Sequence, residues 1–130
     1  MITKEDYKLG VELQRKATNI FNNDNLQNFI KNYVSYLDEI GSVNLVTYYY
    51  IEDIEYCDDE IIVRINEGEY GINVIDIPIE YFWMNSDEWK HIEKEKYEKK
   101  VAEEERAKIE HREKYEKELL QQLKTKYKSK

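Results

Sequence analysis

The chain begins with two stretches whose apolar residues recur at the spacing of an amphipathic helix. The stripe over residues 4–22 consists of Leu9, Leu13, Ala17 and Ile20. Thr3, with Asp6 three residues later, is typical of a helix N-terminus. The stripe over residues 25–40 repeats at intervals of four and three, at Leu26, Ile30, Tyr33, Leu37 and Ile40. We therefore predict two helices, the second ending at Gly41.

The middle of the chain changes to the alternation expected of β-strands. Residues 43–57 are rich in Val, Ile, Thr and Tyr and predict a first strand, with a bulge or break near Glu52–Asp53 where the alternation slips. A hairpin turn is expected at Asp58–Asp59. Two further strands are predicted over residues 61–66 and 72–77, joined by a turn with two glycines. Connections this short favour an antiparallel meander.

The last third of the chain has the pattern of a solvated helix. After an apolar, aromatic elbow over residues 79–84, Glu and Lys recur four residues apart, which predicts a helix over about 87–126. Trp83 and Trp89 flank this junction and are expected to pin the helix to the domain, with a protein-contact patch as the alternative. Arg112 and Glu116 interrupt any coiled-coil seam, so we expect a single helix. A short apolar patch near its end comprises Leu119, Leu120, Leu123 and Tyr127.

Together these elements predict an α+β fold of two N-terminal helices, a three-stranded antiparallel meander and a long charged helix. We place a compact acidic domain at residues 1–86 and a helical tail at residues 87–130. The net charge of −8 is unevenly spread, since residues 1–88 hold 6 Lys and Arg against 18 Asp and Glu, whereas residues 89–130 hold 14 against 10. An acidic body disfavours nucleic acid as a ligand and favours a protein with a basic surface.

Signatures of chemistry and of membranes are weak. The single cysteine, Cys57, allows no intramolecular disulfide and no Cys-based zinc site. No Gly-rich phosphate loop, nucleophile elbow or HExxH motif occurs, so we expect neither an enzyme nor a cofactor. The N-terminus lacks the pattern of a secretory signal, and the apolar runs are too short to cross a bilayer. A cytoplasmic protein is the expectation.

The densest charge feature is the hairpin around Asp58–Asp59. Its candidate partner-binding residues are Glu52, Asp53, Glu55, Asp58, Asp59 and Glu60, together with the tyrosines Tyr48 and Tyr50, which share one face if residues 43–57 form a strand. The carboxylates could imitate the phosphates of a nucleic acid before a basic groove. They could also be a solvated hairpin whose charges prevent edge-to-edge pairing, whereas their spacing matches no EF-hand metal loop.

The segment Ile77-Pro78-Ile79-Glu80-Tyr81-Phe82, followed by the Glu/Lys helix, resembles small accessory proteins encoded by phages of low-GC Gram-positive hosts. In these proteins an antiparallel sheet ends in a short elbow of this kind before a charged helical tail. The likeness covers about residues 55–120. Some small acidic phage proteins inhibit host defences, including CRISPR effectors and restriction systems. The resemblance therefore implies an anti-defence context, and it assigns no functional residue.

Three functions follow as hypotheses. The first is an inhibitor that acts as a DNA mimic: it binds a basic, nucleic-acid-handling host protein through the acidic hairpin, as a monomer or weak homodimer, without contacting nucleic acid or membrane. The second is a sponge for a small signalling nucleotide, which requires Arg64 to lie near Arg15 or Lys16. The third is an oligomeric structural or assembly protein that uses the C-terminal helix.

Overall fold

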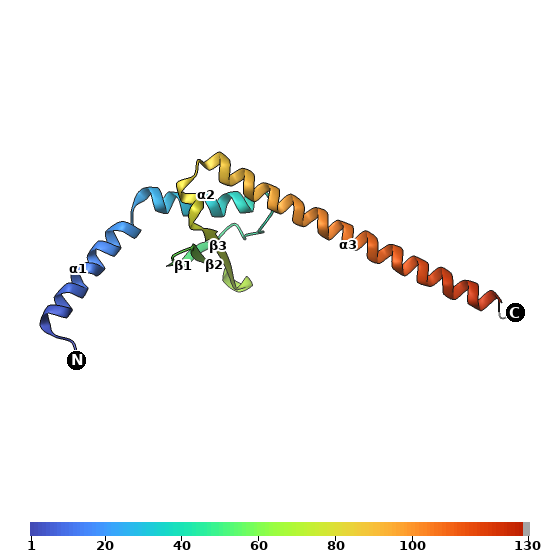
Figure 1. The fold of residues 1–130 in the computed structure, drawn as a ribbon, viewed down its shortest axis with the longest axis horizontal. Helices are drawn as coiled ribbons and strands as arrows, with labels where there is room; N and C mark the ends of the chain where they lie inside the picture. Colours follow the sequence, from blue (N-terminus) through green and yellow to red (C-terminus); the bar gives the residue numbers. More distant parts are fainter. Residues whose placement is uncertain (129–130) are drawn as a thin grey trace. The chain divides into compact units, whose positions relative to one another are not determined.

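The computed structural model describes residues 1–128 as an α+β fold (Figure 1). The elements in chain order are α1 (Lys4–Phe21), α2 (Asp24–Glu39), β1 (Tyr50–Tyr56), β2 (Glu60–Asn66), β3 (Ile72–Pro78) and α3 (Ser86–Lys128), with short 3-10 helices at Gly68–Tyr70 and Ile79–Trp83. The predicted class and order of elements are confirmed. The chain divides into two units, Met1–Lys90 and His91–Lys130.

The sheet has the order β1-β2-β3, and both pairings are antiparallel. Its inner face carries the alternating residues of β2 and β3, which are almost completely buried: Ile61, Val63, Ile65, Ile75 and Ile77. The register of β1 against β2 shifts between Ile51 and Asp53, which confirms the predicted bulge. The bulge restores the inward direction of Ile54 opposite Val63.

The core forms where α2 packs on the sheet (Figure 1). Asn23 caps the helix, because its Oδ1 accepts hydrogen bonds from the N–H groups of Asn25 (2.9 Å) and Leu26 (3.4 Å). The predicted apolar stripe is buried at Leu26, Ile30, Tyr33 and Leu37, and Val34 joins it. Each such side chain contributes about 1.5–3 kcal/mol by leaving water.

The prediction of a strand over residues 43–57 is wrong for its first half. The strand begins at Tyr50, because β2 ends at its partner Asn66 and offers no backbone for pairing beyond that residue. Carboxylates bind the preceding segment instead: Asp38 Oδ1 accepts from the N–H of Leu45 at 2.9 Å, and Glu67 Oε1 accepts from that of Val46 at 3.2 Å. β-branched composition therefore overstated the length of the strand.

The elbow after β3 ends at a buried aromatic cluster. Trp89, in the first turns of α3, is 2% exposed, and its ring lies 5.4 Å from that of Tyr33 and 5.7 Å from that of Tyr36. The Tyr36 hydroxyl also donates to the carbonyl of Lys90 at 3.2 Å. The expected pinning role is thus confirmed for Trp89. It is wrong for Trp83, which is 75% exposed because it lies at the end of a 3-10 helix whose buried residue is Tyr81.

The helix α3 is the most solvated element. Every described side chain from Glu98 to Lys128 is exposed. Near its start His91 Nε2 lies 3.0 Å from Glu95 Oε1, and an ion pair joins Lys96 Nζ to Glu93 Oε1 at 3.7 Å. None of the helices within residues 1–128 contains a stretch long and apolar enough to cross a lipid bilayer.

Candidate functional site: an acidic open sheet face

The sheet face that does not pack on α2 carries three of the six predicted acidic residues, Asp53, Glu55 and Glu60. Antiparallel neighbours direct their side chains to the same side. One such row joins Asp53, Arg64 and Val74, and the next joins Glu55, Ile62 and Asp76. All of them are exposed except the half-buried Ile62. We call this surface the open face.

The hairpin end adds further carboxylates to the open face. Glu60 pairs with Pro78 across β2 and β3, and its carbonyl accepts a hydrogen bond from the N–H of Cys57 at 2.9 Å. Asp58 and Asp59 form the predicted turn, both exposed, and the Asp59 carbonyl accepts from the N–H of Ile79 at 3.0 Å. Glu52 is exposed in the bulge of β1.

The carboxylates of this cluster affect the pKa of the Cys57 thiol. Partial desolvation of the thiolate raises its pKa above 9.0, the ordinary value, and the nearby carboxylates of Glu55, Glu60, Asp58 and Asp76 raise it further. Four carboxylates from two hairpins thus act on one side chain. Asp76 was not among the predicted site residues, although its outward position on the third strand was readable from the alternation. Its proximity to Glu55 depends on the register of β2 with both neighbours.

The two predicted tyrosines lie near the other end of the sheet. Tyr50, 57% exposed, begins β1 opposite Asn66, which pairs on its other side with Ile72. Tyr48 does not belong to the strand, so the expectation of a shared strand face is wrong. It lies in a turn and is 60% exposed. Its ring sits over Gly68, where an added Cβ would be 3.0 Å from Tyr48 Cε2.

The described part of the chain was compared with the two ligand sites considered from the sequence, a metal centre and a cluster of cations. Within residues 1–128 no group of three or more His, Cys, Asp or Glu side chains is arranged to hold a metal ion. Arg64 is paired in the sheet ladder with Asp53, whereas Arg15 and Lys16 are on α1. Arg15 borders a surface hollow formed by α1 residues alone.

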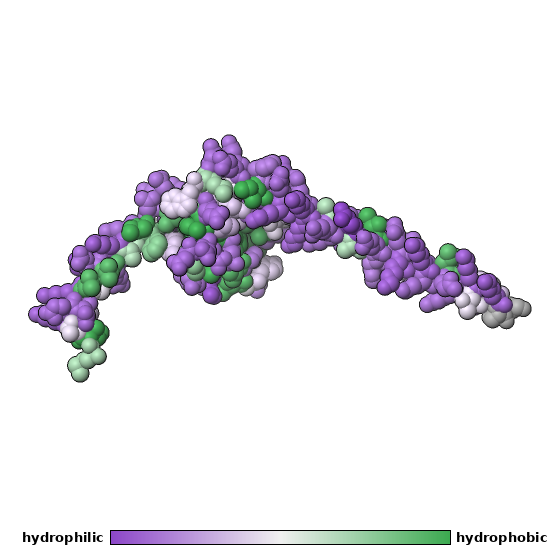
Figure 2. Space-filling model, viewed as in Figure 1, coloured by the Kyte–Doolittle hydropathy of each residue, from purple (hydrophilic) through white to green (hydrophobic). Residues whose placement is uncertain are grey.

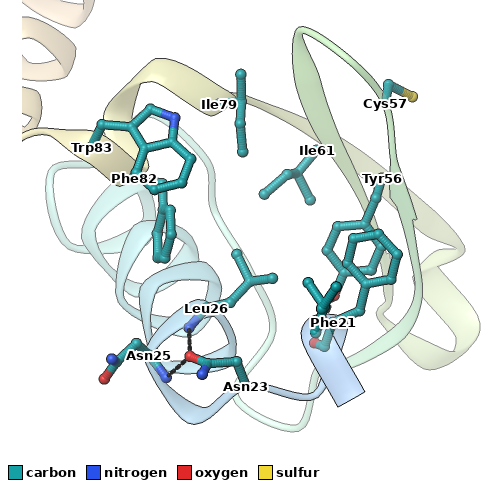
Figure 3. Close-up of a pocket in the computed structure, with 11 residues that line it drawn as sticks. Phe21, Asn23, Asn25, Leu26, Tyr56, Cys57, Ile61, Ile79, Phe82 and Trp83 are labelled. Atoms are coloured by element: carbon teal, nitrogen blue, oxygen red, sulfur yellow. Dashed lines mark hydrogen bonds between the residues drawn. The ribbon is translucent and has the colours of Figure 1, made fainter. Parts of the chain in front are cut away.

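A second surface feature, an apolar groove, was not predicted from the sequence. It has a volume of about 460 Å³ and lies between the α1–α2 turn, the β1–β2 hairpin and the elbow after β3 (Figure 3). Its walls include Phe21, Leu26, Tyr56, Ile61, Phe82 and Trp83. Cys57 stands at its margin with the sulfur directed away from the hollow (Figure 3). Residues so distant in sequence meet only through the tertiary fold, so no local signal could have revealed the groove.

The apolar stripe of α1 is a third free surface. The helix has no buried residue, and Leu9, Leu13 and Ile20 are between 54% and 63% exposed. Figure 2 shows apolar side chains along the visible side of this helix. At its end the ring of Phe21 stacks on that of Tyr56 at 4.1 Å between centroids.

No family model matches the chain, and neither the curated proteins nor the solved structures include a significant match. Conclusions about function therefore rest on the geometry and the charge of the chain itself.

Proposed function

We propose that the chain is a non-enzymatic binding protein, a phage-type accessory inhibitor that occupies a basic surface of a nucleic-acid-handling host defence protein. The open face is the contact surface. Its carboxylates take the place of nucleic-acid phosphates, and Tyr50 supplies rigid apolar contact area at its edge.

The observation that carries this proposal is the placement of Glu55 and Asp76 in one cross-strand row, with Glu60 at the adjoining end of β2 and Asp58 in the neighbouring turn. Like charges placed together repel one another, so such a cluster costs the isolated chain free energy. A cationic partner removes that cost and gains attraction. Arg64 is the one cation in the two central rows, which leaves the surface strongly negative.

The distribution of charge also argues against direct binding of nucleic acid. Affinity for a phosphate backbone comes largely from Lys and Arg that release condensed counterions. The described domain presents carboxylates on its open face and no Lys or Arg in its apolar groove. A basic protein that itself binds nucleic acid is the partner of complementary charge.

The test is a competition experiment. Purified host nucleases and other defence proteins are loaded with a fluorescent DNA or RNA duplex, and the chain is titrated in at several salt concentrations. We expect displacement of the duplex from at least one of them, weakening as salt rises because exposed charges are screened over about 8–10 Å. The combined substitution D58K/D59K/E60K should weaken displacement by more than tenfold.

A matched control is available on α3. The substitution E103K/E104K/E105K makes the same change in net charge at three exposed positions of the other unit. It should leave displacement within about twofold of the wild type, because these residues are not part of the open face and the effect of exposed charges outside the contact is screened. Equal losses in the two triple variants, or none in either, would remove the open face as the binding surface.

A further inference from the structure

The charged residues next in sequence to the lining of the apolar groove are all acidic. Neither the lining residues nor their immediate sequence neighbours include Lys or Arg, whereas Asp24, Asp58 and Glu80 each adjoin a lining residue and are exposed. Its volume of about 460 Å³ lies within the range of about 300–1,000 Å³ usual for ligand sites. The occupant that fits is an apolar anchor carried on a basic segment.

The chain itself contains such a segment at the end of α3. The apolar patch of Leu119, Leu120, Leu123 and Tyr127 is between 43% and 67% exposed. On a helix these four positions fall within about 100° of the circumference, so they form one face. Residues 119–128 hold three lysines and no Asp or Glu. Lys124 and Lys128 border the same surface hollow as Leu120, Leu123 and Tyr127.

We propose that the apolar groove of one copy binds the C-terminal apolar patch of a second copy. Leu123 and Tyr127 enter the groove as anchors, Trp83 covers them from its rim, and the neighbouring lysines face the surrounding carboxylates. This is helix-in-groove recognition. The contact joins two different surfaces. If each of two copies binds the other's patch in its own groove, a symmetric dimer results; otherwise the contacts continue into longer assemblies.

Charge selects the groove over the stripe of α1 as the acceptor. Residues 4–21 hold four Lys and Arg against three Asp and Glu, so α1 offers no net attraction to a lysine-flanked patch. The charged residues that adjoin the groove lining in sequence are all Asp or Glu. The contact does not depend on the proposed inhibitor function, because none of the residues that line the groove belongs to the two rows of the open face.

A complementation experiment tests the pairing in full-length chains. W83K places a cation at an exposed rim position, and L123E places a carboxylate in the patch while keeping a strong helix former. In sedimentation velocity we expect the wild type to associate with rising concentration and each variant alone to associate at least tenfold more weakly. The equimolar mixture should recover association, because it unites an intact groove with an intact patch.

Each alternative has its own outcome. Association that is lost in L123E and kept in W83K would assign the patch to α3 self-pairing or to α1, and would overturn the groove. Association kept in L123E, a mixture that fails to recover, or a wild type that stays monomeric at every concentration would also overturn the proposal. N25K, at another exposed lining residue that is not part of the α1 stripe, repeats the groove test if W83K alters the circular dichroism spectrum.

Tryptophan quenching supplies an independent readout. Trp89 is 2% exposed and Trp83 is 75% exposed, so acrylamide reaches mainly Trp83. In the wild type the quenchable fraction should fall as concentration rises, and in L123E it should stay constant. Association of the wild type without protection of Trp83 would contradict the proposed contact.

The variants W83K and L123E leave the open face unchanged, so they should still displace nucleic acid from the partner. A failure of the proposed self-association can therefore be distinguished from a failure of the proposed inhibitor function.

Discussion

The helices α1 and α2 have similar sequence patterns, but they differ in how much of their apolar stripe is buried. Each has a side-chain cap and an apolar stripe, yet α2 buries five residues in the core and α1 buries none. The stripe of α2 faces the sheet, whereas α1 meets the rest of its unit at its C-terminal end, where Phe21 stacks on Tyr56 and its carbonyl accepts from Gln27 Nε2 at 2.7 Å. Apolar periodicity therefore predicts a helix without predicting that its face reaches a core.

The largest expected effect comes from truncating the same kind of side chain on both helices. Ile30 on α2 is 0% exposed, so I30A should lower the free energy of unfolding by about 2–5 kcal/mol through lost burial and the cavity left behind. Leu13 on α1 is 55% exposed, so L13A should change it by less than about 0.5 kcal/mol. Urea unfolding followed by fluorescence measures both. Equal losses would show that the stripe of α1 is covered in solution.

The helix caps make a smaller, parallel comparison. N23A removes the acceptor for two N–H groups of α2 and should cost about 1 kcal/mol of global stability. T3A breaks the reciprocal bonds between Thr3 and Asp6, which are 3.1 and 3.2 Å long. Because α1 contributes nothing to the core, T3A should reduce helical circular dichroism while the unfolding midpoint stays unchanged. A midpoint shift as large as that of N23A would tie α1 to the cooperative unit.

The smallest expected effect is a shift in the pKa of Cys57. It concerns the sheet, whose inner face is buried like the stripe of α2 and whose open face is exposed like the stripe of α1. Neutralising two carboxylates by E55Q/E60Q should lower the pKa of Cys57, because the charges that disfavour its thiolate are removed. The pH profile of its reaction with a thiol reagent should then shift toward lower pH. E103Q/E104Q on α3 is the matched control and should leave the profile unchanged. An unshifted profile in E55Q/E60Q would mean that these carboxylates do not converge on the thiol.

The sequence predicted the features that depend on near neighbours. The second helix, the bulge at Glu52–Asp53, the turn at Asp58–Asp59 and the three-strand order all follow from local period and turn chemistry. The start of β1 depended instead on where β2 ends, and that length is set by the turn at Gly68–Gly71, where both glycines have positive φ.

Features that several distant segments form together could not be predicted from local sequence patterns. The exposure of Trp83 and the burial of Trp89 differ although both are tryptophans at one junction. What separates them is the ring cluster contributed by α2, including Tyr33 and Tyr36. The apolar groove has the same origin, since Phe21, Ile61 and Phe82 come from three separate elements. Residue type alone carried no signal for either.

The most direct test of the open face as a binding surface uses Cys57, the single cysteine. A photo-crosslinker attached there and irradiated in host extract should join the chain to a nucleic-acid-binding protein with a basic surface, and excess duplex DNA or RNA should suppress the product. A chain carrying C57S and T125C moves the same crosslinker to α3 as a control. Suppression by nucleic acid at position 57 alone is the predicted result. Crosslinking that nucleic acid does not suppress, or that is equal from both positions, would contradict the account.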